Sequence, residues 1–194
     1  MEQAVRKIAL LGMGTVGGGV YEIIERQKEE MPFKIGAALE VVKVLVRNKA
    51  KYADRIPAEK LTDVWEDVIG DDSIDIVVEV MGGIEPARTY IKAALEKGKH
   101  VVTANKDLMA MHGHELLELA GEHHCDLLFE AAVAGGIPII RPLKQCLAGN
   151  HMSEVMGIVN GTTNFILTKM TQDGMEFKDA LALATELGYA EADP

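Results

Sequence analysis

Strand-like runs of apolar residues alternate along this chain with longer helix-like segments. The strand-like runs are almost continuously apolar, as in Ile74–Val80, and do not alternate strictly between apolar and polar positions. Such runs are typical of parallel strands that helices cover on both faces. The predicted strands are Lys7–Leu11, Leu39–Val46, Ile74–Val80, His100–Thr103 and Asp126–Ala131, and the predicted helices are Val16–Glu30, Thr62–Ile69, Pro86–Lys97, Lys106–Glu122 and Pro138–Ala148.

The first predicted strand leads directly into a glycine fingerprint. Gly12-Met13-Gly14-Thr15-Val16-Gly17 follows Lys7–Leu11 and opens a helix, which is the order that a dinucleotide site requires. The first glycine permits a tight turn, the second lets a pyrophosphate approach the backbone, and the third lets helix and strand pack closely. The helix N-terminus then offers unpaired N–H groups to the phosphates. We predict dinucleotide binding here; the alternative is a glycine-rich turn without a ligand.

The character of the sequence changes after about residue 132. Small residues fill the segment Ala131–Pro138, and a helix, a strand near Glu154–Val159 and two helical stretches follow. Together with the fingerprint, this organisation predicts an α/β fold with a Rossmann-type, doubly wound, mostly parallel sheet that binds NAD(P) in residues 1–132. Residues 133–194 are predicted to begin a second, α+β domain.

The residue after the second predicted strand is expected to select the cofactor. Sheets of this kind carry an Asp or Glu there for the ribose 2′-hydroxyl of NAD, whereas an Arg accommodates the 2′-phosphate of NADP. This chain has Arg47 at that place, and Glu40 lies at the other end of the strand. We therefore predict NADP, with NAD possible; the alternative is that Arg47 is only a solvated residue at a strand end.

Two further strand ends carry groups that suit a site, because open α/β sheets bind ligands outside the carboxyl ends of their strands. Met81-Gly82-Gly83 follows one strand, and Gly82 is predicted to let the backbone come close to the cofactor. Lys106 follows Thr103-Ala104-Asn105 and opens a helix, where an ammonium group could orient a carbonyl or move a proton. A plain turn and a solvated charge are the alternatives.

Composition argues against several classes of function. The formal net charge of −10 argues against non-specific binding to nucleic acid or to an anionic membrane surface. The only cysteines, Cys125 and Cys146, lack a C-x-x-C spacing, so we expect neither a disulfide framework nor a cysteine zinc site, and a cytoplasmic protein. Neither serine lies in a G-x-S-x-G motif, and no P-loop motif occurs.

Together these segments resemble homoserine dehydrogenases. The resemblance implies an oxidoreductase of threonine and methionine biosynthesis that interconverts L-homoserine and L-aspartate 4-semialdehyde by hydride transfer with a nicotinamide cofactor. It also implies that the second domain serves substrate binding and dimerisation, with a homodimer or higher oligomer at full length. The matching segments are collinear and cover nearly the whole chain: Leu10–Gly17, Val78–Gly83, Val102–Lys106, Phe129–Pro138, Ile158–Asn164 and Leu187–Pro194.

The resemblance also implies roles for individual residues. It places Lys106 in the active site, near both the nicotinamide of the cofactor and the substrate, Gly188 at the cofactor and Glu191 at the substrate amino group. The segment from Glu130 to Ile137 resembles the family's site for a monovalent cation, Na⁺ or K⁺. The oxygen ligands that the resemblance implies are those of Glu130 and the backbone carbonyls of Val133, Gly135 and Ile137.

One family feature is not found in these residues. In the family, the segment that matches Glu191-Ala192-Asp193-Pro194 leads into a helix with Asp-x-x-x-Lys, whose lysine is the proposed proton donor and acceptor. We therefore expect this chain to be a truncated portion that is weakly active or inactive. The alternative from another class is a non-catalytic, redox-sensing dinucleotide module, which needs neither Lys106 nor Asn160–Asn164.

Overall fold

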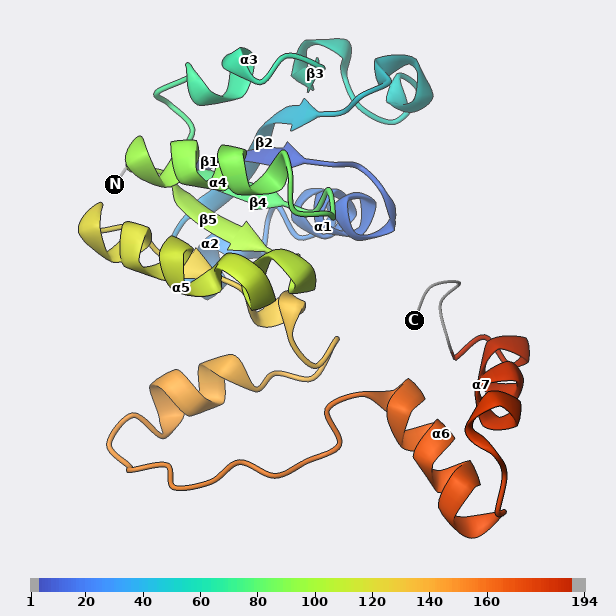
Figure 1. Cartoon of the computed structure of the whole chain (residues 1–194). Helices are drawn as coiled ribbons and strands as arrows, with labels where there is room; N and C mark the ends of the chain where they lie inside the picture. Colours follow the sequence, from blue (N-terminus) through green and yellow to red (C-terminus); the bar gives the residue numbers. More distant parts are fainter. Residues whose placement is uncertain (1–3, 190–194) are drawn as a thin grey trace. The chain divides into compact units, whose positions relative to one another are not determined.

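The structure, a computed structural model, describes residues 4–189 (Figure 1). They form two compact units that divide between Ile140 and Arg141. Every strand of the described residues belongs to the first unit, and helices α6 and α7 belong to the second. The domain boundary predicted after residue 132 stays a prediction. No helix within residues 4–189 is long and apolar enough to cross a membrane.

The first unit is built on a six-stranded sheet in the order β3-β2-β1-β4-β5-β6. All neighbouring strands in this sheet are parallel. From β1 the chain runs outward to β2 and β3 on one side and then to β4, β5 and β6 on the other, so the predicted doubly wound topology is confirmed. The strands are β1 (Val5–Leu11), β2 (Ala38–Leu45), β3 (Leu61–Thr62), β4 (Ile76–Glu79), β5 (His100–Thr103) and β6 (Leu127–Leu128).

Helices cover both faces of this sheet. Successive residues of β1 point to opposite faces, so Ala9 and Leu11 join one apolar cluster and Ile8 and Leu10 join another. The first cluster includes α4 and α5, which lie side by side over one face, and the second includes Ile24 of α1 (Figure 1). The helices of this unit are α1 (Thr15–Arg26), α2 (Met31–Ile35), α3 (Glu66–Ile69), α4 (Ala87–Glu96) and α5 (Lys106–Glu122), with 3-10 turns at Lys49–Tyr52, Ala58–Lys60 and Glu130–Ala132.

The helix predicted over Thr62–Ile69 is only partly correct. Its first residue ends β3, which pairs with β2 through the register Leu45↔Thr62. The Thr62 hydroxyl donates to Asp67 Oδ2 at 2.5 Å and accepts the N–H of Val64 at 3.0 Å. This side chain therefore closes the turn between β3 and α3, and the helix begins only at Glu66.

The second unit is a small helical pair preceded by an extended segment. Asn160 accepts a hydrogen bond from the N–H of Thr163 at 2.7 Å and so caps α6 (Gly161–Gln172), which packs against α7 (Phe177–Glu186). The helix predicted over Pro138–Ala148 is reduced to a π-helical turn at Pro142–Cys146.

The strand predicted near Glu154–Val159 is wrong for this structure. The segment forms no strand, and the side chains of Val155 and Val159 are 68% and 92% exposed. A strand has to exchange hydrogen bonds with a neighbouring strand. The sheet of the described residues lies entirely in the first unit, so the second offers this segment no strand to pair with.

Candidate functional site

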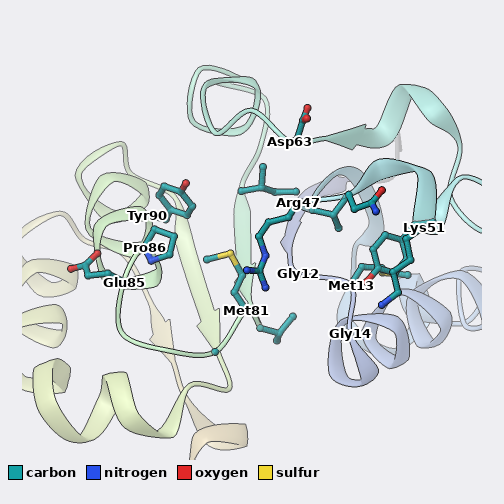
Figure 2. Close-up of a pocket in the computed structure, with 16 residues that line it drawn as sticks. Gly12, Met13, Gly14, Arg47, Lys51, Asp63, Met81, Glu85, Pro86 and Tyr90 are labelled. Atoms are coloured by element: carbon teal, nitrogen blue, oxygen red, sulfur yellow. The ribbon is translucent and has the colours of Figure 1, made fainter.

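A cavity of about 530 Å³ opens at the carboxyl ends of the central strands (Figure 2). Its walls come from the turn after β1, the residues that follow β2, and the loop between β4 and α4. This is the place where the strand order reverses, and open α/β sheets bind their ligands there. Predicted site residues that line the cavity are Gly12, Met13, Gly14, Arg47 and Gly82.

The three glycines of the fingerprint have different surroundings. Gly12 has a φ of +98°, and a Cβ there would lie 2.9 Å from the carbonyl oxygen of Val80. A Cβ on Gly17 would lie 2.2 Å from the carbonyl oxygen of Gly12, so the start of α1 packs directly on the turn. A Cβ on Gly14 would meet no atom within 4 Å. The backbone at Gly14 is therefore open on the side where a ligand can approach.

The N-terminus of α1 is left available to an anion. Thr15, Val16 and Gly17 form its first turn, and their N–H groups have no acceptors within the helix. No side chain caps this end, and its first turn holds no acidic residue. Partial positive charge at the start of a helix favours phosphate groups. The geometry suits a pyrophosphate, although the cofactor contacts of these residues stay predictions.

Cations gather at the β2 side of the cavity. Arg47 is exposed, and Figure 2 shows its guanidinium turned into the cavity. Lys51 also lines the cavity, and its Nζ lies 5.4 Å from the centre of the Tyr52 ring. Lys49 instead pairs with Asp63, Nζ to Oδ1 at 2.7 Å, and this hydrogen bond lowers the pKa of the Asp63 carboxyl. Arg47 was predicted from the sequence and Lys51 was not. The signal was present in the sequence, because every second residue from Arg47 to Lys51 carries a positive charge.

A buried polar pair links the ends of β4 and β5. Glu79 and Thr103 are both completely buried, and they are direct register partners. The Glu79 carboxyl accepts the N–H of Met81 at 2.8 Å and the hydroxyl of Thr103 at 2.6 Å. Sequence reasoning passed over Glu79, although an acid inside the apolar run Ile76–Val80 was a signal.

The other predicted residues are less closely tied to the cavity. Lys106 is exposed at the first position of α5, directly after Asn105, and is not among the lining residues. Gly188 follows α7 in the second unit with a φ of +74°. Glu191 lies outside the described residues. The structure thus brings together the predicted fingerprint, Arg47 and Gly82, while the roles of Lys106, Gly188 and Glu191 stay predictions.

The predicted cation segment is a tight turn closed by its own carboxylate. Glu130 Oε1 accepts the N–H groups of Ile139 at 2.5 Å and Ile140 at 2.9 Å. Ala134 and Gly135 both have left-handed backbone, with φ of 56° and 58°. Within residues 4–189 no group of three or more His, Cys, Asp and Glu residues could hold a metal ion. One carboxylate with backbone carbonyls still matches the oxygen ligands that hard cations take.

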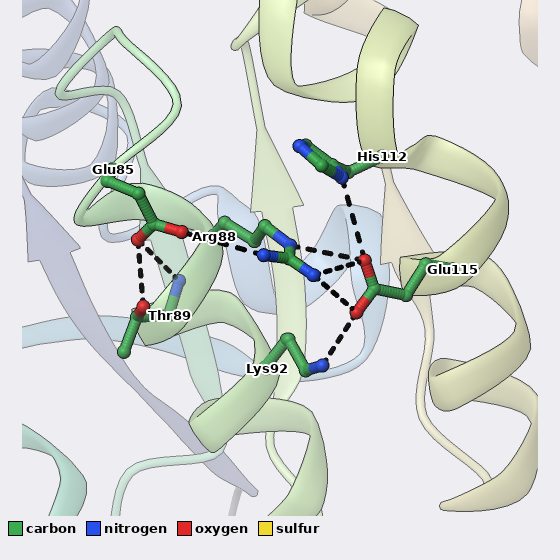
Figure 3. A network of polar contacts seen from close by, with 6 residues as sticks. All are labelled: Glu85, Arg88, Thr89, Lys92, His112 and Glu115. Carbon is green, nitrogen blue, oxygen red and sulfur yellow. Dashed lines mark hydrogen bonds and ion pairs between the residues drawn. The ribbon is translucent and has the colours of Figure 1, made fainter.

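A network of charged side chains joins α4 to α5 at the surface (Figure 3). Glu115 is held by Lys92, Nζ to Oε1 at 2.6 Å, and by Arg88, Nη2 to Oε2 at 2.8 Å. These hydrogen bonds lower the pKa of the Glu115 carboxyl to about 2. His112 Nδ1 lies 3.6 Å from the same carboxylate, and Arg88 also reaches Glu85 on the cavity rim at 3.8 Å.

Replacing Glu115 by Gln should lower the stability of the first unit at neutral pH. The folded pKa of about 2 lies below the ordinary value of 4.5, so the stabilisation is present above pH 4.5 and is lost as pH falls toward 2. The difference in urea midpoint between wild type and Glu115→Gln should therefore narrow below pH 4.5. Glu118→Gln is the control, because Glu118 is on the same helix and its ion pair is with the exposed His114. Equal pH dependence of the two variants would contradict the assignment.

Comparisons with known proteins agree along the whole chain. A family model described as "Homoserine dehydrogenase, NAD binding domain" matches residues 12–130, and one described as "Homoserine dehydrogenase" matches residues 138–194. The homoserine dehydrogenase of Bacillus subtilis (strain 168) is 49% identical over 189 residues, which are 97% of this chain and 44% of that protein. That of Mycobacterium tuberculosis (strain H37Rv) is 52% identical over 188 residues, 96% of this chain and 42% of that protein.

Solved structures give the same result. A homoserine dehydrogenase from Thiobacillus denitrificans superposes with a TM-score of 0.86 at 46% identity, covering 99% of this chain and 45% of that one. A hyperthermophilic archaeal homoserine dehydrogenase, solved in complex with NADPH, superposes with a TM-score of 0.79 at 31% identity, covering 98% and 63%. The chain spans less than half the length of the curated relatives described above.

Proposed function

This chain belongs to the homoserine dehydrogenase family, as its sequence motifs predict, and we propose that it is the cofactor-binding part of an enzyme that interconverts L-homoserine and L-aspartate 4-semialdehyde. The observation that carries the proposal is the cavity at the reversal of strand order, with the open backbone of Gly14 on one wall and Arg47 turned into it. A glycine turn that packs against Val80, the residue after β4, and against the start of its own helix, and that leaves one side open, suits a dinucleotide better than a plain turn.

The residues around the cavity fit NADP. The backbone of Gly12–Gly14 and the uncapped start of α1 would hold the pyrophosphate, and Arg47 with Lys51 would meet the 2′-phosphate. Gly82 and Gly188 are proposed as further cofactor contacts. The archaeal relative solved with NADPH supports this choice. The nicotinamide ring supplies the hydride acceptor or donor when the cofactor is bound.

We assign the remaining predicted residues to the substrate. Lys106 follows β5 at the same sheet edge as the cavity, where its ammonium group would orient the substrate oxygen and assist proton movement. Glu191 would bind the substrate amino group through its carboxylate. The proposal keeps a homodimer or higher oligomer for the full-length protein, and a cytoplasmic location supported by two unpaired cysteines.

Arg47→Ala should remove the preference for NADPH. A charge-assisted hydrogen bond contributes about 1.5–3 kcal/mol, so the Kd for NADPH should rise roughly tenfold to a hundredfold while that for NADH stays unchanged. Equilibrium titration of both cofactors measures this directly. Arg26→Ala is the matched control, because Arg26 ends α1 and does not line the cavity. An unchanged ratio of the two Kd values in Arg47→Ala would remove Arg47 from the proposal.

We also propose that the turn from Glu130 to Ile137 binds Na⁺ or K⁺. Glu130→Gln keeps an acceptor for the N–H groups of Ile139 and Ile140 while removing the negative charge. Wild type should melt at a higher temperature in Na⁺ or K⁺ than in choline at equal ionic strength, and Glu130→Gln should lose that difference. A melting temperature of wild type that ignores the identity of the cation would leave the turn a purely structural hinge.

A further inference from the structure

The buried carboxyl of Glu79 begins a chain of hydrogen bonds that reaches the first turn of α5. The Thr103 hydroxyl, which donates to Glu79, also accepts the N–H of Asn105 at 3.1 Å. Asn105 in turn caps α5 by accepting the N–H of Leu108 at 3.1 Å. Its side-chain amide donates to the carbonyl oxygen of Gly83 at 2.5 Å. The chain of contacts therefore runs from the end of β4 to the helix that Lys106 opens, and back to the loop after β4.

Both ends of this chain of contacts lie at the proposed site. Met81, whose N–H is held by Glu79, lines the cavity together with Gly82. Asn105 directly precedes Lys106, the first residue of α5. The glycines at 82 and 83 have φ of +74° and +73°, a left-handed backbone that tertiary contacts have to hold in place. The hydrogen bond from Asn105 to Gly83 supplies such a contact.

We propose that Glu79, acting through Thr103 and Asn105, is a positioning residue that fixes the cofactor loop Met81–Gly83 to the start of α5, and so sets the place of the nicotinamide half of the cofactor relative to Lys106. The inference rests on the proposed function for the identity of the ligand. The bracing itself rests only on the hydrogen bonds of Glu79, Thr103 and Asn105.

The chemistry of the pair makes Thr103 difficult to replace. Its hydroxyl group donates its one proton to the Glu79 carboxyl and accepts the N–H of Asn105 with a lone pair. One side chain is therefore both a donor and an acceptor. Valine has the same shape and neither function, which would leave a buried carboxyl oxygen and a buried N–H without partners. Within the described residues every buried side-chain polar atom has a hydrogen-bond partner, so this loss would be an exception in the structure.

The position of the network predicts which half of the cofactor it affects. Glu79 ends β4 and Arg47 follows β2, and these strands flank β1 on opposite sides. A dinucleotide lies across that reversal, with one mononucleotide half on each side. The hydrogen bonds at the ends of β4 and β5 therefore affect binding of the nicotinamide half, which NADP and NAD share. Arg47 instead affects binding of the 2′-phosphate, which only NADP has.

Thr103→Val tests the inference with two measurements. The Kd values for NADPH and NADH should rise by the same factor, about tenfold, because the lost contacts lie in the half that both cofactors share. Trp65, the only tryptophan, stacks at 4.2 Å on Tyr90 of the cavity wall, so its fluorescence can report binding. Amide hydrogen exchange should also become faster at Met81 and Leu108, with or without cofactor.

Two controls separate positioning from general destabilisation. Thr103→Ser keeps the hydroxyl and should restore both Kd values and the amide protection. Lys99 is buried directly before β5, at the opposite end of this strand from Thr103, and its Nζ donates to the carbonyl oxygens of Asp71 and Ile74. Lys99→Met removes this ammonium group and both hydrogen bonds. It should lower the melting temperature and leave both Kd values unchanged. Glu79→Gln has nearly the same volume and gives a second test if Thr103→Val does not fold.

The outcomes distinguish this inference from the proposed function. A wild-type chain that binds neither cofactor would overturn the proposed function, while the exchange at Met81 and Leu108 would still support or overturn the bracing. Unchanged Kd values and unchanged exchange in Thr103→Val would overturn the positioning role. A loss of NADPH affinity alone would also overturn it, because it would place the effect at the 2′-phosphate.

Discussion

Gly14→Ala should abolish most cofactor binding without weakening the fold. A Cβ at this position meets no protein atom within 4 Å, and the backbone, with φ −74° and ψ −156°, is open to alanine. The added methyl group would occupy the space through which a pyrophosphate approaches the start of α1. Displacing the phosphates from even one backbone N–H costs about 1.5–3 kcal/mol, so the Kd for NADPH should rise roughly tenfold to more than a hundredfold.

Neighbouring glycines provide the controls for this prediction. Gly19→Ala also places a methyl group in open space, but within α1 and away from the cavity, so it should bind NADPH as wild type does. Gly17→Ala should lower the melting temperature, because its Cβ would lie 2.2 Å from the Gly12 carbonyl oxygen. NADPH titration and thermal melts of the three variants separate the cases. If Gly14→Ala binds NADPH with the wild-type Kd, the pyrophosphate does not lie against the backbone of this residue.

Local sequence pattern was enough to predict much of the first unit. β5 (His100–Thr103) and α5 (Lys106–Glu122) have the predicted bounds, because a short apolar run and a helix capped by Asn105 are local features. The two-residue strand β3 escaped prediction, since only pairing with β2 defines it. The segment Glu154–Val159 has the apolar pattern of a strand, but pattern cannot supply a pairing partner.

The candidate site likewise contains residues that local sequence predicts and pairs that only the tertiary structure brings together. The glycine turn and Arg47 could be predicted as site residues because the role proposed for them depends on their place directly after a strand. The link between Glu79 and Thr103 joins residues 24 positions apart, and only the parallel register of β4 and β5 places them opposite each other. The pairing of Lys49 with Asp63 likewise depends on where β3 ends. Such pairs form only in the tertiary structure, so they cannot be predicted from a local sequence motif.

Homoserine oxidation by the 194-residue chain alone should be about 10²–10⁴ times slower than by a form that continues through the family's Asp-x-x-x-Lys helix. When the carbon–hydrogen bond of the alcohol gives up its hydride, the hydroxyl proton also has to leave, and a positioned acid–base group contributes about that factor. The resemblance places the lysine for this step after Glu191–Pro194, and it leaves Lys106 as a helper. A substrate that is held less completely also reacts more slowly, because orientation itself lowers the barrier.

The comparison is made at saturating NADP and homoserine, following NADPH absorbance, after both proteins have been shown to bind NADPH with the same Kd. Equal cofactor affinity ensures that a difference in turnover reports the chemical step and not the cavity around Gly14 and Arg47. Lys106→Ala in the longer form should lower turnover by a much larger factor than it raises the NADPH Kd, since Lys106 does not line the cavity. Comparable turnover by the two lengths of chain would contradict the prediction and would make Lys106 the principal acid–base residue of the site.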